Sequence, residues 1–131
     1  MKKFIFAIIF SFIAIAVSAQ TISFRTTSYT YKEMGYYGWT DWKPYQSSNM
    51  LITMDLTNDV VTIYSPKTQI YAIYSYNGSY VDSDGDQISK YSFVDQDGDI
   101  GQMRLVIRRN GTSELYIDFS NIIWVYSVIR L

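Results

Sequence analysis

Apolar and polar residues alternate along most of the chain after residue 20, which is the pattern of β-strands with one buried and one solvated face. Apolar side chains occupy the even positions of Met50–Leu56, the odd positions of Gln102–Arg108 and the odd positions of Glu114–Phe119. No segment keeps an apolar period of about 3.6 residues. Segments rich in Tyr, Ile, Val and Thr predict further strands at residues 22–31, 60–64, 69–74, 88–94 and 122–128.

Short polar turns separate the predicted strands. They fall at Thr57–Asp59, Ser65–Lys67 and Ser120–Asn121, while Asn110–Gly111 predicts a type I′ hairpin turn and Asn77–Gly78 is also interpreted as a turn. Eight short strands indicate an all-β protein, an antiparallel meander that forms a small barrel or a sandwich. We expect the barrel, because closure removes exposed strand edges. The predicted strands, of about five to eight residues, are shorter than the about 9–11 residues of a membrane-spanning strand.

The N-terminus has the three regions of a secretory signal peptide. Two lysines follow Met1, Phe4–Val17 is apolar with one exception, and Val17–Ala19 offers small residues to a signal peptidase. A retained anchor is the alternative, but the apolar run is short for a span of about 20 residues. The sequence therefore predicts a signal peptide over residues 1–19 and a single all-β domain over residues 20–131. We expect a bacterial protein that is periplasmic or secreted, without stable membrane insertion after cleavage.

Composition excludes much of enzyme chemistry. The 131 residues include 11 Lys and Arg, 12 Asp and Glu, no His and no Cys. Without Cys there is no disulfide, thiolate nucleophile or thiolate metal site, and without His the commonest proton-transfer side chain near neutral pH is missing. The formal charge of −1 gives no electrostatic reason to expect nucleic acid. We therefore expect no enzyme, no nucleic-acid partner and no cofactor, calcium being the one ion considered.

An acidic segment occurs twice along the chain. Ser79–Asp86 and Ser92–Asp99 differ at only two positions, and each ends in the pattern D-x-D-G-D. Closely spaced carboxylates can hold calcium, although the glycine position and the missing final Glu depart from the EF-hand pattern. Turn formation explains the same residues. Because the two loops flank one predicted strand, we expect two separate sites. The candidate metal ligands are Asp82, Asp84, Asp86, Asp95, Asp97 and Asp99.

Aromatic residues are concentrated between Gly35 and Tyr45. Exposed Trp and Tyr side chains on a loop offer large contact areas to a glycan, a peptide or a partner protein. The alternative is that Trp39 and Trp42 plug one end of the barrel, with Trp39 inward and Trp42 at the rim.

Aromatic residues of the last two predicted strands extend this binding face, if they point outward. We expect that orientation for Tyr116, Trp124 and Tyr126, although cross-strand stacking would explain them equally well. The candidate ligand-binding residues are Tyr37, Trp39, Trp42, Tyr45 and Trp124.

Several short motifs form a distinctive series along the chain. They are Trp39–Trp42, Asp55, Ile63–Ser65, Gln69–Tyr71, Asp95–Gly98 and Leu115–Ile117. Together with the signal peptide, they resemble small secreted β-proteins encoded by gut Bacteroidetes. The resemblance covers most of residues 21–126, implies an exported all-β protein and transfers no site residues. Size and strand count are also similar, at the level of fold alone, to small periplasmic barrels such as lipocalin-like and lysozyme-inhibitor domains.

The leading hypothesis is an exported, non-enzymatic binding domain that uses surface aromatic residues, with an unknown ligand. A calcium-stabilised structural β-domain is the first alternative. A carboxylate-dependent hydrolase is the second, since paired carboxylates can perform acid–base catalysis. Glu33 and Glu114 are the only Glu residues, and neither stands in a recognisable motif.

Overall fold

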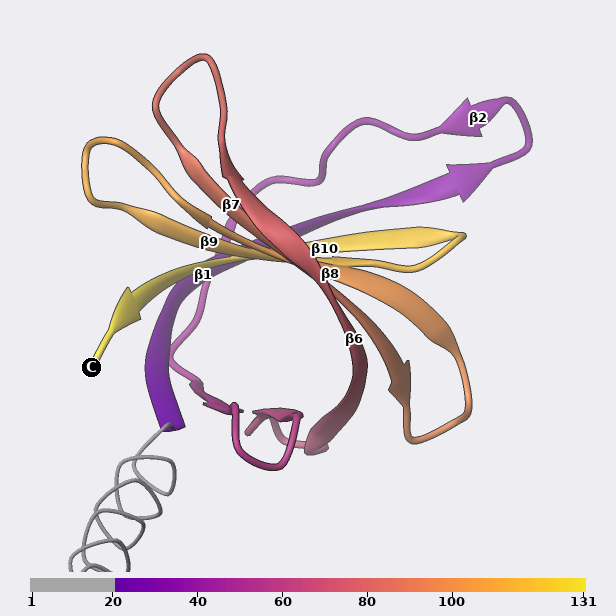
Figure 1. Ribbon diagram of the computed structural model, residues 1–131. Coiled ribbons are helices and arrows are strands. Elements are labelled where there is room, and N and C mark those ends of the chain that lie inside the picture. The colour runs from indigo at the N-terminus through magenta and orange to yellow at the C-terminus, as the bar shows by residue number, and fades with distance from the viewer. Residues whose placement is uncertain (1–20) are drawn as a thin grey trace, which may run out of the picture.

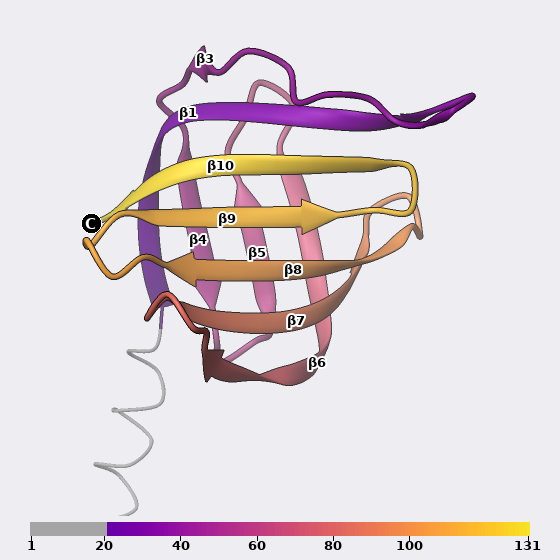
Figure 2. The ribbon, with the colours of Figure 1, turned by 90° about the horizontal axis from the view of Figure 1, so that it is seen from above.

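Every regular element in residues 21–131, the part of the chain that the computed structural model describes, is a β-strand (Figures 1 and 2). The strands are β1 (Thr21–Gly35), β2 (Gly38–Trp39), β3 (Gln46–Ser47), β4 (Leu51–Asp55), β5 (Val60–Ile63), β6 (Gln69–Val81), β7 (Gln87–Asp95), β8 (Ile100–Ile107), β9 (Ser113–Asp118) and β10 (Ile122–Arg130). The all-β prediction is confirmed. Within these residues no helix is long and apolar enough to cross a membrane. The predicted signal peptide lies outside the described residues.

Eight of the strands form a closed antiparallel barrel. Each pairs with the next in the order β1, β4, β5, β6, β7, β8, β9 and β10, and β10 returns to pair with β1. The closing ladder runs from Phe24 opposite Arg130 to Glu33 opposite Ile122. The predicted meander and the preference for a barrel over a sandwich are therefore confirmed. β2 and β3 are short additions that pair with β1.

One apolar cluster fills the barrel, and every barrel strand contributes to it. Ile52, Met103 and Ile117 are completely buried, as the alternation predicted. Leu56, expected on the same face as Ile52, is exposed because it lies in the turn after β4, beyond the paired residues. Full burial of one aliphatic side chain stabilises a fold by roughly 1.5–3 kcal/mol. With no cysteine in the chain, this cluster is the main source of stability.

β1 is longer than the expected five to eight residues because it belongs to two walls of the barrel. Its first part pairs with β4 and its later part with β10, and Figure 2 shows it turning from one wall into the other. The register shifts between Thr26 and Ser28, where a bulge lets the strand bend. The bulge also reverses the inward parity of the side chains. Phe24 and Thr26 are buried before it, whereas Tyr29 packs against the core after it.

β6 bends in the same way and continues well past the predicted end at Tyr74. Its register shifts between Ile73 and Ser75 and again between Tyr76 and Ser79. The second shift lies at Asn77–Gly78, where Gly78 has a φ of 101°. The prediction of a turn at Asn77–Gly78 was therefore wrong, because the glycine forms a bulge within a continuous strand.

Three hairpin loops share one backbone geometry, at residues 82–86, 95–99 and 108–112. In each, the N–H of the first residue donates to the C=O of the fifth, and the N–H of the fourth, a glycine, donates to the C=O of the first. The three glycines have φ values of 83°, 83° and 91°. This is a three-residue hairpin loop with a glycine bulge. The type I′ prediction at Asn110–Gly111 was wrong, because Asn110 does not take a positive φ; its side chain instead accepts the Thr112 N–H at 3.0 Å.

Gly101 allows two neighbouring groups to approach the backbone of β8. A Cβ atom at this position would lie 2.6 Å from the Phe93 ring and 2.6 Å from the Asp118 carbonyl oxygen. The Phe93 side chain is completely buried in the core, so it has no free space into which it could move. The close packing of β7, β8 and β9 therefore requires glycine here.

We expect Gly101→Ala to lower the free energy of unfolding by about 1–3 kcal/mol, the usual cost of overpacking a core. Ile100→Ala is the matched control, because Ile100 is the preceding residue and its side chain is 66% exposed. Urea denaturation followed by tryptophan fluorescence measures both. Equal stability of the two variants would show that the contacts at Gly101 relax without cost.

Candidate functional site

The residues Glu33–Trp42, called the arm below, extend beyond the barrel as a narrow hairpin (Figures 1 and 2). Met34 pairs with Trp39 and Gly35 with Gly38, so Tyr36 and Tyr37 form the tip. The tip side chains are 95% and 98% exposed. Their rings contact each other edge to face, with centroids 5.0 Å apart. The arm therefore presents two large apolar rings that do not pack on the barrel.

The base of the arm carries two of the three tryptophans that the sequence singled out, Trp39 and Trp42. The Lys32 ammonium lies 5.5 Å from the Trp39 ring and 4.7 Å from the Trp42 ring. Such cation–π contacts at exposed sites contribute about 0.5–1 kcal/mol each. Trp39 and Trp42 are 40% and 43% exposed, and Lys32 itself pairs with Ile123 on the outer face of the barrel. The alternative in which both rings plug the barrel, with Trp39 inward, is therefore wrong.

Residues 40–48 return along the edge of β1 that β10 does not occupy. The backbone hydrogen bonds are Thr40 N–H to Glu33 C=O, Lys43 N–H to Tyr31 C=O and Ser48 N–H to Thr27 C=O, at 2.8, 2.9 and 3.0 Å. The Thr30 hydroxyl also donates to the Lys43 carbonyl, and Thr30 is buried although it lies on the outer face. This return segment fixes the base of the arm and covers an edge that would otherwise be unpaired.

The structure separates the five predicted ligand-binding residues into two groups. Tyr37, Trp39 and Trp42 lie on the arm. Tyr45 follows in the return segment and is 58% exposed. It lies near Tyr116 on the outer face, where burial raises the pKa of Tyr116 and the charges of Glu114 and Tyr45 add to the rise.

Trp124 belongs to the opposite face of the sheet. It pairs with Ile117, a core residue, and its ring packs against Tyr31 with centroids 4.7 Å apart. Tyr126 is also inside, only 4% exposed. The expectation that Trp124 and Tyr126 point outward with Tyr116 was therefore wrong, because cross-strand partners share a face and Tyr116 pairs with Val125.

Trp124 instead lines a pocket of about 560 Å³ at one end of the barrel, called the mouth pocket below. The loops after β5 and β7 and the end of the return segment surround it. Its aromatic lining residues are Tyr29, Tyr71, Phe119, Trp124 and Tyr126. Sequence reasoning missed this pocket, because simple alternation from Phe24 places Tyr29 outside the barrel. Only the bulge in β1 brings it inside.

A second pocket, of about 470 Å³, is lined by the β4–β5 turn and the middle of β6. The Asp55 carboxylate at its rim accepts the N–H groups of Thr57 and Asn58, each at 3.1 Å, and the Asn58 side-chain amide at 2.9 Å. These hydrogen bonds lower the pKa of Asp55, with the Asn58 amide as the largest cause. The carboxylate therefore holds the turn and is not a free acid–base group.

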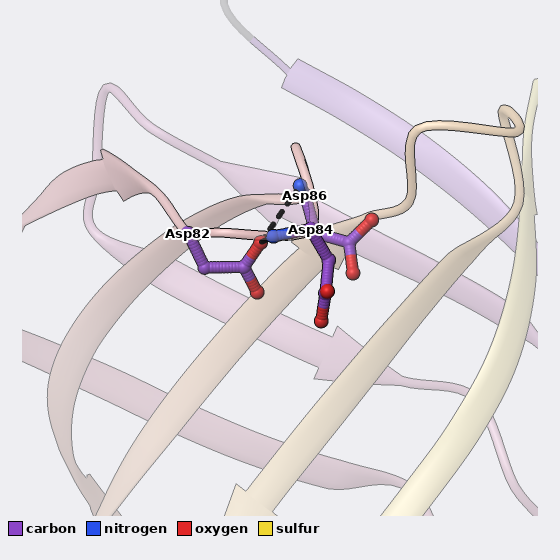
Figure 3. Close-up of side chains that lie close together, drawn as sticks. All are labelled: Asp82, Asp84 and Asp86. Carbon is purple, nitrogen blue, oxygen red and sulfur yellow. Dashed lines mark hydrogen bonds between the residues drawn. The ribbon is translucent and has the colours of Figure 1, made fainter.

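Each acidic loop brings its three predicted carboxylates together. One oxygen from each of Asp82, Asp84 and Asp86 lies within 4.8 Å of the others (Figure 3). Asp95, Asp97 and Asp99 repeat this arrangement in the second loop. Asp82 Oδ1 accepts the N–H groups of Asp84 and Asp86, at 2.9 and 3.0 Å. The first Asp of each loop thus uses one oxygen to form the turn, and its other oxygen lies beside the remaining two carboxylates.

The two loops lie at opposite ends of β7, as expected, and their third carboxylates have different neighbours. Asp86 accepts the Arg109 N–H at 2.9 Å and an Arg108 guanidinium N–H at 3.0 Å. The same guanidinium also binds Glu114, and these partners raise the pKa of Arg108. The Arg109 N–H is the largest cause that lowers the pKa of Asp86, with Arg108 adding to it. In the part of the chain that the structure describes, no hydrogen bond or ion pair to the Asp99 carboxylate is found.

No family model matches the chain, and no curated protein or solved structure is significantly similar to it. The resemblance to secreted Bacteroidetes proteins and to lipocalin-like barrels therefore stays a prediction. Residue geometry alone has to carry the functional argument.

We expect Asp86→Ala to lower the melting temperature more than Asp99→Ala, because only Asp86 accepts hydrogen bonds from Arg108 and Arg109. The folded-state pKa of Asp86 lies below the unfolded value. Its stabilisation is thus complete above the unfolded pKa of about 3.9 and is lost as the pH falls through the folded-state pKa. The deficit of Asp86→Ala relative to the wild type should therefore shrink in acid. Thermal melts between neutral pH and acid test this, and a deficit independent of pH would contradict it.

Proposed function

We propose that this is an exported, non-enzymatic binding protein that contacts a partner protein through the arm. The observation that carries the proposal is the exposure of Tyr36 and Tyr37, at 95% and 98%, on a hairpin that extends beyond the barrel. The signal-peptide pattern of residues 1–19 supports export. The concentration of aromatic residues between Gly35 and Tyr45 supports the arm as the binding surface.

Large aromatic rings are costly to leave in water, and they stabilise a complex when a partner buries them. A Tyr or Trp side chain buries about 150–250 Å² and loses little conformational entropy, because few torsions must be fixed. Residues of this type dominate the binding energy of many interfaces. On the arm, Met34, Trp39 and Trp42 add further exposed apolar area beside the tip. Together they form an anchor that the barrel itself does not cover.

The shape of the arm favours a protein over a free sugar or another small ligand. Small molecules bind in concave sites that enclose most of their surface. The arm is the reverse, a projecting hairpin whose tip has no walls around it (Figure 1). A partner with its own groove or pocket could enclose the two rings. Of the glycan, peptide and protein partners considered from the sequence, a protein therefore fits best.

One carboxylate at each pocket is already used to hold a turn, which favours binding over hydrolysis. The Asp55 carboxylate at the second pocket holds its own turn. Asp95 at the mouth pocket does the same, because its Oδ1 accepts the N–H groups of Asp97 and Asp99, both at 2.9 Å. Glu114 binds Arg108, and Glu33 lies on the arm away from both pockets.

Photocrosslinking tests the proposal directly. With Tyr37→p-benzoylphenylalanine in the full-length chain expressed in its source bacterium, we expect one dominant crosslinked protein, identified by mass spectrometry. We then expect Tyr36→Ala/Tyr37→Ala to weaken binding of that purified protein by at least about 2 kcal/mol, the level of an interface hot spot, as measured by calorimetry.

Tyr74 provides the matched control, because its side chain is 62% exposed on β6, within the barrel wall. Crosslinks of equal yield from position 74, or unchanged affinity of the double variant, would refute the arm as the contact surface. If crosslinks form only between two copies of this chain, the arm mediates self-association and does not bind a different protein.

A further inference from the structure

The mouth pocket has aromatic walls whose rings are held in place by hydrogen bonds. The Tyr71 hydroxyl donates to Gln69 Oε1 at 2.6 Å, and the Tyr29 hydroxyl donates to Gln46 Oε1 at 2.8 Å. The hydroxyl groups are therefore already engaged with the protein. The walls of the pocket are consequently organised before any ligand enters.

The aromatic rings of the lining form two groups of neighbouring rings. The Tyr29 centroid is 6.2 Å from that of Trp124 and 6.2 Å from that of Tyr126. On the other side, Tyr71 and Phe119 have centroids 6.5 Å apart. Met50 adds a polarisable thioether to the same lining. A ligand in this pocket would meet aromatic surfaces contributed by both sides.

The rim of the pocket is acidic. Asp95 and Asp97 both line it, whereas Lys67 is the only cation among the lining residues that the structure describes. Burial is the main cause that raises the pKa of Tyr71, and the charges of Tyr126 and then Asp95 add to the rise. Lys67 is exposed and forms no ion pair within residues 21–131. The charge balance therefore disfavours an anionic ligand.

Elsewhere the protein places its own cations over four aromatic rings that lie outside the pocket. Lys32 lies over Trp39 and Trp42, Lys90 over Tyr80, and Arg104 over Tyr116 at 4.2 Å. By contrast, none of the five aromatic rings that line the mouth pocket has a Lys or Arg over its face in the described residues. The pocket thus combines electron-rich ring surfaces with two carboxylates. The space over its rings is open to a cation carried by a ligand.

We propose that the mouth pocket binds an organic cation, an ammonium group on a short apolar stem. The aromatic quadrupoles attract such a cation, and the apolar stem buries against the same rings. The rim carboxylates add Coulomb attraction that a neutral ligand would not use. The pocket volume of about 560 Å³ is within the range of small-ligand sites. The site lies in the barrel and is independent of the arm, so either assignment can fail without the other.

The test compares choline with its neutral isostere 3,3-dimethylbutan-1-ol, with glucose as a third ligand. The protein is expressed from the full-length sequence, and the indole N–H resonances of its three tryptophans are followed by NMR. Trp→Phe variants assign the three signals. We expect choline to shift the Trp124 signal saturably while Trp39 and Trp42 stay unchanged, and the isostere to bind at least about tenfold more weakly. An unshifted Trp124 signal, or equal affinity for the isostere or glucose, overturns the proposal.

The duplicated acidic loop supplies a matched pair of charge variants. Asp97→Asn should weaken choline binding about threefold, the effect of one charge in a solvated rim. Asp84→Asn, the equivalent change in the loop at the other end of β7, should leave the affinity unchanged. Lys67→Gln should strengthen binding about threefold, since it removes the cation from the rim. If Asp97→Asn and Asp84→Asn have the same effect, or if Lys67→Gln weakens binding, the cation assignment is wrong.

Discussion

The pairing of β1 with β10 is the constraint on which the rest of this structure depends. It closes the barrel, and it also fixes the face on which each aromatic residue of these two strands lies. Tyr31 opposite Trp124 brings both rings to the inside, while Lys32 opposite Ile123 brings the lysine to the outside, beside the tryptophans of the arm. Because β1 continues past the end of this ladder at Glu33, residues 34–42 of the arm have no barrel strand beside them and project from the barrel. One ladder therefore produces both aromatic surfaces, on opposite sides of a single layer of backbone.

The duplicated acidic loop shows how the same local sequence acquires two different environments. In both copies the first Asp accepts the same two backbone N–H groups, so the turn geometry is local and repeats. The third Asp differs, because the first loop lies beside the β8–β9 hairpin that carries Arg108 and Arg109, and the second loop borders the mouth pocket. An Arg pair consumes the ligand oxygens of Asp86, whereas the second loop keeps its charge at the rim of a cavity. The charge that each D-x-D-G-D loop leaves uncompensated therefore depends on the position of the loop in the barrel and not on its sequence.

Strand identity was predictable from the sequence because it rests on short-range periodicity. Each of the eight predicted strands corresponds to a barrel strand, and Ile52, Met103 and Ile117 are buried as the alternation required. The bulges were not predictable, because a bulge changes parity by one residue without changing composition. The single shift between Thr26 and Ser28 places Tyr29 inside and thereby creates one wall of the mouth pocket. The bulge at Gly78 could not be told from a turn for a second reason: a glycine with positive φ fits a turn and a bulge equally well.

The inward position of Trp124, by contrast, could have been deduced. Antiparallel partners share a face, and the short Ser120–Asn121 turn aligns Trp124 with Ile117, which the alternation had already placed in the core. Alternation within a single strand does not carry this information, whereas pairing across the hairpin does. The two faces of the sheet also differ in whether a cation of the protein lies over their aromatic rings. On the outer face Lys32 and Arg104 already lie over the rings, whereas no Lys or Arg of the described chain lies over the rings of the mouth pocket. The two surfaces therefore differ in what they leave for a partner: apolar area on the arm, and attraction for positive charge in the barrel.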